Sequence, residues 1–122
     1  MAAHADLWGE IEPSAVRTPV SILKEQASFL GKKTKHVVEA EVETRTLAGS
    51  FYHAFRLVVP ALDNYSYNLF EISHEVNPYP VSTGYGAATL ANEEAFVNWL
   101  AQKLSSSETK RIIGNLLAQA NS

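Results

Sequence analysis

Apolar and polar residues alternate one by one through residues 36–75, which is the pattern of β-strands with one buried face. Two short breaks divide this block, and they fall at Ala48-Gly49 and Asp63-Asn64, where residues that favour tight turns stand. The pattern therefore predicts three consecutive antiparallel strands, a β-meander.

Hairpin geometry decides which residues share a face of this sheet. If the first loop is two residues long, Phe55 lies opposite Val42 and Arg56 lies opposite Glu41. Side chains alternate strictly across a strand, so this register gathers the apolar positions on one inner face. Those positions are Val38, Ala40, Val42, Phe55, Leu57, Val59, Phe70 and Ile72.

The second turn leaves two registers open. A two-residue loop places Arg56 opposite Glu71, which completes a row of alternating charges with Glu41 on the outer face. Pro60 cannot donate a hydrogen bond to a ladder, so a four-residue loop over residues 61–64 is the alternative. That loop shifts the register by two residues and removes the direct Arg56–Glu71 pair, but it keeps every side chain on its face.

A helix precedes the meander. Thr18 is a capping residue and Pro19 suits the first helical position, so we predict a helix over residues 19–30 that stops at Gly31. Residues 1–17 show no clean period. They contain several apolar side chains, and we expect part of this N-terminal arm to pack on the body of the protein.

Two helices follow the meander. Asn92 caps the first of them, which runs to Leu104, and Ser106 belongs to a capping pattern that opens the last helix. The apolar stripe of that last helix is Ile112, Ile113, Leu116, Leu117 and Ala120. Residues 76–91, between the meander and these helices, hold two prolines, two glycines and two tyrosines, which predicts a long irregular loop.

These elements predict a single α+β domain over residues 1–122, in the order α-β-β-β-α-α. The first helix and the helix capped by Asn92 pack on one face of a three-stranded antiparallel meander. The last helix packs either on the other helices or on a second subunit. The outer sheet face is rather apolar for a solvated surface, so we expect a homodimer. Its apolar members are Tyr52, Val58, Tyr67 and Leu69.

Composition excludes several classes of protein. The chain has 122 residues, is 46% hydrophobic and 19% charged, and has a net charge of −3, which is typical of a soluble globular protein. It has no cysteine, so thiolate nucleophiles, disulfides and zinc–thiolate sites are excluded. We see no signal peptide and no apolar stretch long enough for a membrane span, and we expect cytoplasmic residence and no membrane partner.

Two histidines, His53 and His74, project to the inner face near the same end of the sheet. With the two-residue second loop they lie opposite one another, and paired imidazoles can bind a metal or act as an acid and a base. A catalytic zinc site has three protein ligands, and no third is evident, so we expect no metal and no cofactor. The other interpretation places both rings at the edge of the core with ordinary hydrogen bonds.

Aromatic and charged residues supply the remaining candidates. Tyr79 and Tyr85 lie in the long loop, where rigid aromatic side chains could bind a partner or could simply anchor a crossover. Arg56 lies among glutamates of the outer face and could bind an anion, although an exposed ion-pair ladder contributes roughly 0 to 1 kcal/mol and needs no function. Tyr52 and Tyr67 share that face.

One basic cluster, Lys-Lys-Thr-Lys-His, occupies residues 32–36. The order helix, three antiparallel strands, helix over residues 18–104 resembles the double-stranded-RNA-binding domain, and residues 18–25 look like the opening of its first helix. That resemblance implies phosphate-binding lysines at the start of the helix after the sheet. Residues 92–94 are Asn-Glu-Glu, which would repel phosphate, and we therefore expect no nucleic-acid partner.

The sequence predicts a non-enzymatic binding or interaction module that acts as a homodimer. It contains no nucleophile-elbow, zinc-protease, phosphate-loop or calcium-loop motif. The alternatives are a small enzyme or ligand carrier with a pocket near His53 and His74, and a weak nucleic-acid binder that uses the lysines of residues 32–35. The candidate binding residues are Tyr79, Tyr85, His53, His74, Tyr52, Tyr67 and Arg56.

Overall fold

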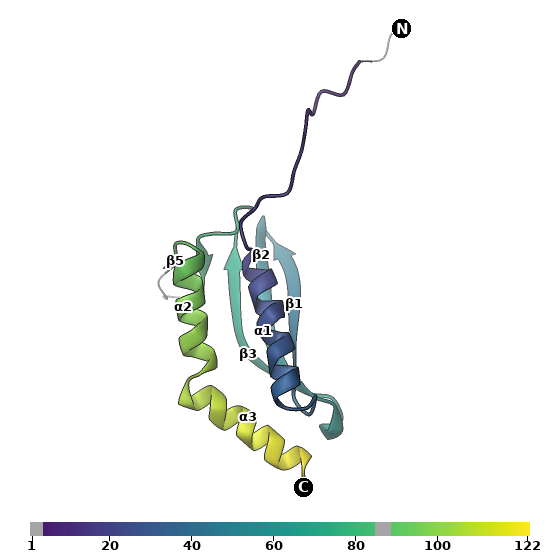
Figure 1. The fold of residues 1–122 in the computed structure, drawn as a ribbon, viewed down its shortest axis with the longest axis vertical. Helices are drawn as coiled ribbons and strands as arrows, with labels where there is room; N and C mark the ends of the chain where they lie inside the picture. The colour runs from purple at the N-terminus through teal and green to yellow at the C-terminus, as the bar shows by residue number, and fades with distance from the viewer. Residues whose placement is uncertain (1–3, 85–88) are drawn as a thin grey trace.

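A computed structural model describes residues 4–84 and 89–122 of the chain. Within these residues it has an α+β fold, in which a five-stranded antiparallel sheet of order β1-β2-β3-β4-β5 is accompanied by three helices (Figure 1). None of these helices combines the length and the apolar character that a membrane crossing requires. In chain order the elements are α1 (Pro19–Lys33), β1 (Glu39–Leu47), β2 (Ser50–Val59), the 3-10 turn η1 (Pro60–Leu62), β3 (Tyr65–His74), β4 (Val81–Ser82), β5 (Thr89–Leu90), α2 (Glu93–Leu104) and α3 (Ser107–Ala120).

Helix α1 starts where the sequence predicts and ends later. The hydroxyl of Thr18 accepts a hydrogen bond from the backbone N–H two residues beyond Pro19, at 3.3 Å. The predicted stop at Gly31 is wrong, because the helix continues to Lys33. Gly31 is buried against β1, and a Cβ atom there would lie 2.6 Å from the carboxylate oxygen Oε2 of Glu39. The glycine therefore gives β1 room beside the helix instead of ending it.

The first hairpin is confirmed. Ala48 and Gly49 form its turn with φ angles of 52° and 82°, as a turn that matches the twist of the strands requires. Phe55 lies opposite Val42. The faces of β1 and β2 are thus fixed by a turn that is visible in the sequence.

The second hairpin has a longer turn, so its predicted two-residue loop is wrong. Pro60 begins the 3-10 turn η1, and Asp63 and Asn64 follow it in the left-handed conformation with φ angles of 55°. Phe55 lies opposite Phe70, which is the register of the four-residue alternative. Pro60 thus leaves the ladder, as its missing N–H requires.

A β-bulge changes the register again nearer this turn. Arg56 lies opposite Asn68, so the predicted direct pair with Glu71 is wrong. The same shift turns Tyr67 to the inner face, where it lies opposite Leu57 and packs against the core. The prediction that Tyr67 lies on the outer face is therefore wrong. One inserted residue on β3 is enough, because it reverses the side-chain alternation on one side of the bulge.

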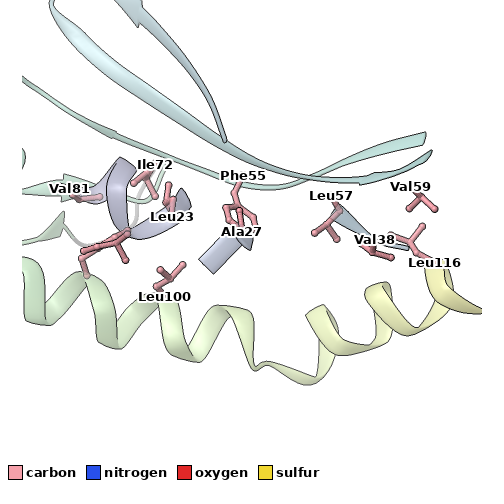
Figure 2. Packing of buried hydrophobic residues seen from close by; sticks show 12 residues of the cluster. Leu23, Ala27, Val38, Phe55, Leu57, Val59, Ile72, Val81, Leu100 and Leu116 are labelled. Atoms are coloured by element: carbon pink, nitrogen blue, oxygen red, sulfur yellow. The ribbon is translucent and has the colours of Figure 1, made fainter. Parts of the chain in front are cut away.

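The core confirms that Phe55, Leu57, Val59 and Ile72 face inwards, as predicted. Figure 2 shows the buried side chains of the strands pointing towards the helices. All three helices contribute to this one cluster, including Leu116 of α3, which is 6% exposed. The stripe of α3 is thus used within its own chain. The cluster consists of Ile22, Leu23, Ala27, Val38, Phe55, Leu57, Val59, Ile72, Val81, Phe96, Leu100 and Leu116.

The segment predicted as a long irregular loop, residues 76–91, contributes two more strands. β4 pairs with β3, and β5 pairs with β4, and Val81 of β4 is fully buried. The three predicted strands are present, and β4 and β5 extend the sheet to five strands. Strands of two residues carry no periodic pattern, so the sequence gives no sign of them. Tyr85 lies outside the described residues.

The N-terminal arm does not pack on the body, so that prediction is wrong. Residues 4–17 are all exposed, and in Figure 1 they run away from the sheet and the helices. Leu7, Trp8 and Ile11 are 86%, 80% and 71% exposed. The arm therefore offers large apolar side chains that its own chain leaves uncovered.

Candidate functional site

His53 and His74 form a contacting pair. They are diagonal neighbours, because His53 lies opposite Ile72 and His74 lies opposite Phe51. The predicted direct opposition is wrong, and its cause is the register of the longer second turn. The two Nε2 atoms are nevertheless 2.9 Å apart, and the ring of Phe51 stacks on that of His74 with 5.4 Å between centroids.

Both rings belong to one chain of hydrogen bonds. His74 Nδ1 lies 2.6 Å from the carbonyl oxygen of Glu75, which only accepts, so this nitrogen carries a hydrogen. In the neutral ring His74 Nε2 then accepts from His53 Nε2, and His53 Nδ1 accepts from the hydroxyl of Thr44 at 2.8 Å. All four ring nitrogens have a partner, so neither ring presents a free nitrogen to a substrate or a metal ion.

Burial keeps His53 neutral. The side chain is 3% exposed, and this burial, followed by the nearby charges of His74 and Lys24, lowers its pKa from 6.5 to about 4. Among residues 4–84 and 89–122, no group of three or more His, Asp or Glu side chains is placed to hold a metal ion. The pair is therefore a buried polar network at one end of the core.

Two hollows lie beside this end of the sheet, and they share Ser73 and Ser82. The first, about 440 Å³, is lined by Tyr52, Glu71, Ile72, Ser73, Ser82 and Gly84. The second, about 350 Å³, is lined by Ser50, Ser73, His74, Glu75, Asn77, Tyr79, Pro80, Ser82 and Thr89. The fold thus brings three predicted site residues together here, namely Tyr52, His74 and Tyr79.

Tyr79 ties the base of the N-terminal arm to the body. Its hydroxyl donates to the carbonyl oxygen of Arg17 at 2.9 Å, and its ring lies 6.4 Å from that of Phe96. Burial raises the pKa of this phenol, Glu93 raises it further, and Arg17 opposes them. The hydroxyl therefore stays protonated and can keep donating to the arm.

Arg56 lies on the outer sheet face and binds β1. Its guanidinium lies 2.8 Å from Glu43 and 3.4 Å from Glu41, so the predicted neighbour Glu41 is confirmed. The Nε atom of Arg56 is buried and has no hydrogen-bond partner among the described residues. Exposed ion pairs of this kind contribute about 0 to 1 kcal/mol.

Glu71 forms an ion pair with Arg45 and not with the predicted Arg56. Arg45 lies 3.3 Å from Glu71, and its guanidinium carbon sits 4.4 Å above the ring of Tyr52. The outer face thus carries two groups of paired charges. That pairing leaves Arg45 less available for a bound anion.

A third hollow, which the sequence did not predict, lies between α1 and the corner of α2 and α3. This interhelical groove measures about 480 Å³, and its lining is mostly apolar. Phe29 on its α1 side is 45% exposed. The lining residues are Gln26, Phe29, Leu30, Lys33, Phe55, Leu57, Ala101, Leu104, Ser105, Thr109, Lys110 and Ile113.

The groove is lined by positive charge and by no histidine or carboxylate. Its charged lining residues are Lys33, from the basic cluster, and Lys110. The hydroxyl of Thr109 is committed, since it donates to the carbonyl oxygen of Lys103 at 2.8 Å. The arrangement suits an apolar group that carries negative charge beside it.

Comparison of the chain with protein-family models, curated proteins and solved structures finds no match in any of the three. The function is therefore argued from the geometry of the chain itself.

Proposed function

We propose that the chain is a non-enzymatic binding module that acts as a homodimer, and that the interhelical groove is its binding surface. The observation that carries the proposal is the composition of the groove, where apolar side chains surround the open space and two lysines supply the charge. A concave apolar site with few polar groups is the ordinary form of a binding pocket. Phe29, a large aromatic side chain, is left exposed in the lining.

The histidine pair supports a non-enzymatic role. General acid–base catalysis needs a ring nitrogen that can reach a substrate, directly or through a water molecule. His74 lines a hollow, but both its nitrogens bind groups of the same chain, and His53 lies behind it. A catalytic mechanism that used His74 would first have to break these hydrogen bonds.

The chemistry of the groove indicates the class of occupant. Leu30, Leu104 and Ile113 offer apolar contact, while Lys33 and Lys110 carry positive charge. An occupant with apolar side chains flanked by carboxylates or another anion would satisfy both. The hydrophobic effect would favour burial of this occupant, and the lysines would orient it.

The dye anilinonaphthalene sulfonate (ANS), which is apolar and anionic, tests the groove. It is titrated in excess, so that it competes with any protein occupant, and its fluorescence is measured with the wild type, Phe29→Glu and Val97→Glu. Phe29 lines the groove, whereas Val97 of α2 is 41% exposed outside its lining, which makes the second variant a matched control.

The proposal expects Phe29→Glu to weaken dye binding by about tenfold or more, equivalent to roughly 1.4 kcal/mol, and Val97→Glu to leave it unchanged. Circular dichroism of both variants checks that they fold. Equal dye binding by the two folded variants would remove the groove from the proposal. Sedimentation tests the dimer, which is expected at twice the chain mass of 13.4 kDa.

A further inference from the structure

We infer that the occupant of the interhelical groove is the N-terminal arm, residues 4–16, of a second copy of this chain. The inference rests on the proposed function, because it names the partner that the groove binds. Two copies would each donate one arm and receive one. The dimer would then be held by two equivalent arm-in-groove contacts.

The arm has the apolar side chains that such a groove needs. Leu7, Trp8 and Ile11 are exposed by more than two thirds of their surface, and residues 4–17 have no buried member. Large apolar side chains gathered on a few consecutive residues mark an interaction segment more often than an isolated one does. Trp8 is also of the residue type that most often anchors an interface.

Charge matches the arm to the groove. Residues 4–16 include Asp6, Glu10 and Glu12 and contain no lysine or arginine. The groove is lined by Lys33 and Lys110 and by no carboxylate. The acidic residues flank Trp8 and Ile11, so the apolar side chains could enter the groove while the carboxylates stay near its lysines.

The anchored base of the arm directs the arm away from its own groove. Arg17 is held by Tyr79 through its carbonyl oxygen and by Glu25 through its guanidinium, at 2.9 Å and 3.0 Å. From this point the arm leaves beyond the N-terminal end of α1 (Figure 1), whereas Phe29 lies about 15 Å further along the helix in the opposite direction.

Length does not limit the exchange. From Trp8 to Pro19 the chain can extend to about 36 Å, which is more than the length of α1. The arm can therefore cross to a neighbouring molecule and lie along its groove.

Sedimentation of two variants and their mixture tests the inference. Trp8→Glu removes the anchor of the arm, and Phe29→Glu closes the groove to an acidic segment; both positions are exposed, so both chains are expected to fold. Each variant alone is expected to be monomeric. Their equimolar mixture is expected to form a heterodimer, because the intact arm of one chain fits the intact groove of the other.

The controls separate this inference from the proposed function. Val97→Glu is expected to remain a dimer, and excess ANS is expected to convert the wild-type dimer to monomers because it fills the groove. If Trp8→Glu and Phe29→Glu both stay dimeric while the dye still requires Phe29, the arm exchange is wrong and the groove proposal stands. A mixture that stays monomeric overturns the exchange as well, since an arm bound in its own groove would behave in this way.

Reversal of charge gives a second, independent test. Lys33→Glu with Lys110→Glu is expected to weaken the dimer by about tenfold or more at low salt. Mixing that chain with one that carries Glu10→Lys and Glu12→Lys is expected to restore association, because both arm-in-groove contacts of the mixed pair join opposite charges. Equal association of the matched and mismatched pairs would contradict the role of charge.

Discussion

The histidine pair and the interhelical groove differ in a way that separates reactive residues from an available surface. His53 and His74 are the most reactive side-chain types in the fold, yet all their ring nitrogens bind partners within the chain. The groove contains no such residues, yet it is hollow and exposes Phe29. An exposed apolar hollow, rather than a reactive residue type, therefore locates the place where this chain can bind.

The largest expected effect comes from breaking the histidine network. His53→Ala leaves the partners of a buried imidazole without hydrogen bonds and opens a cavity, so we expect the free energy of unfolding to fall by about 2 to 4 kcal/mol. His4→Ala is the control, because His4 is exposed. Urea unfolding of both variants measures the difference, and equal losses would contradict a structural role for the pair.

Acid should weaken the same network. In the unfolded chain His53 binds a proton below pH 6.5. In the folded chain it binds a proton only below its lowered pKa of about 4. This contribution to stability is therefore complete above pH 6.5 and is lost as the pH falls towards 4, by about 2 to 3 kcal/mol. Unfolding is measured across this range for the wild type and His53→Asn. Parallel pH profiles of the two chains would show that His53 is not the source.

The groove should be far less important for folding than for binding. Phe29→Ala and Val97→Ala both change exposed side chains, so we expect each to alter the free energy of unfolding by no more than about 1 kcal/mol. Thermal unfolding of the two variants, with ANS binding measured alongside, tests this. If Phe29→Ala lowered the free energy of unfolding as much as His53→Ala, the groove would belong to the core. The proposed difference between the two regions would then be wrong.

The smallest effect is expected on the outer face, where charges pair in solvent. Arg45→Gln removes the ion pair with Glu71 and the contact with Tyr52, and we expect a loss of about 0 to 1 kcal/mol that shrinks as salt is added. Urea unfolding at low and high ionic strength measures it. A loss that is independent of salt would point to packing on Tyr52 as its source.

Local pattern was sufficient for part of the fold. The alternation of apolar residues and the turn at Ala48-Gly49 predict which face carries Phe55 and Ile72, because a strand's side chains can only alternate. The bulge on β3 leaves no such mark, and Tyr67 was therefore assigned to the wrong face. Two-residue strands are likewise too short for a period, so the fourth and fifth strands were missed.

The candidate site shows the same division. The closeness of His53 and His74 follows from their shared face on neighbouring strands, and the sequence predicts it. The groove depends on the distance and angle at which α1 stands from the corner of α2 and α3, and no local pattern encodes these. The one sequence signal that could have indicated it is an aromatic residue, Phe29, one helical turn before Lys33.

Nuclear magnetic resonance of the isotope-labelled chain with saturating ANS tests the central contrast most directly. We expect shifts at Leu30, Leu104 and Ile113, with the imidazole signals of His53 and His74 unchanged. Shifts of the two imidazoles, with the groove residues unmoved, would contradict it.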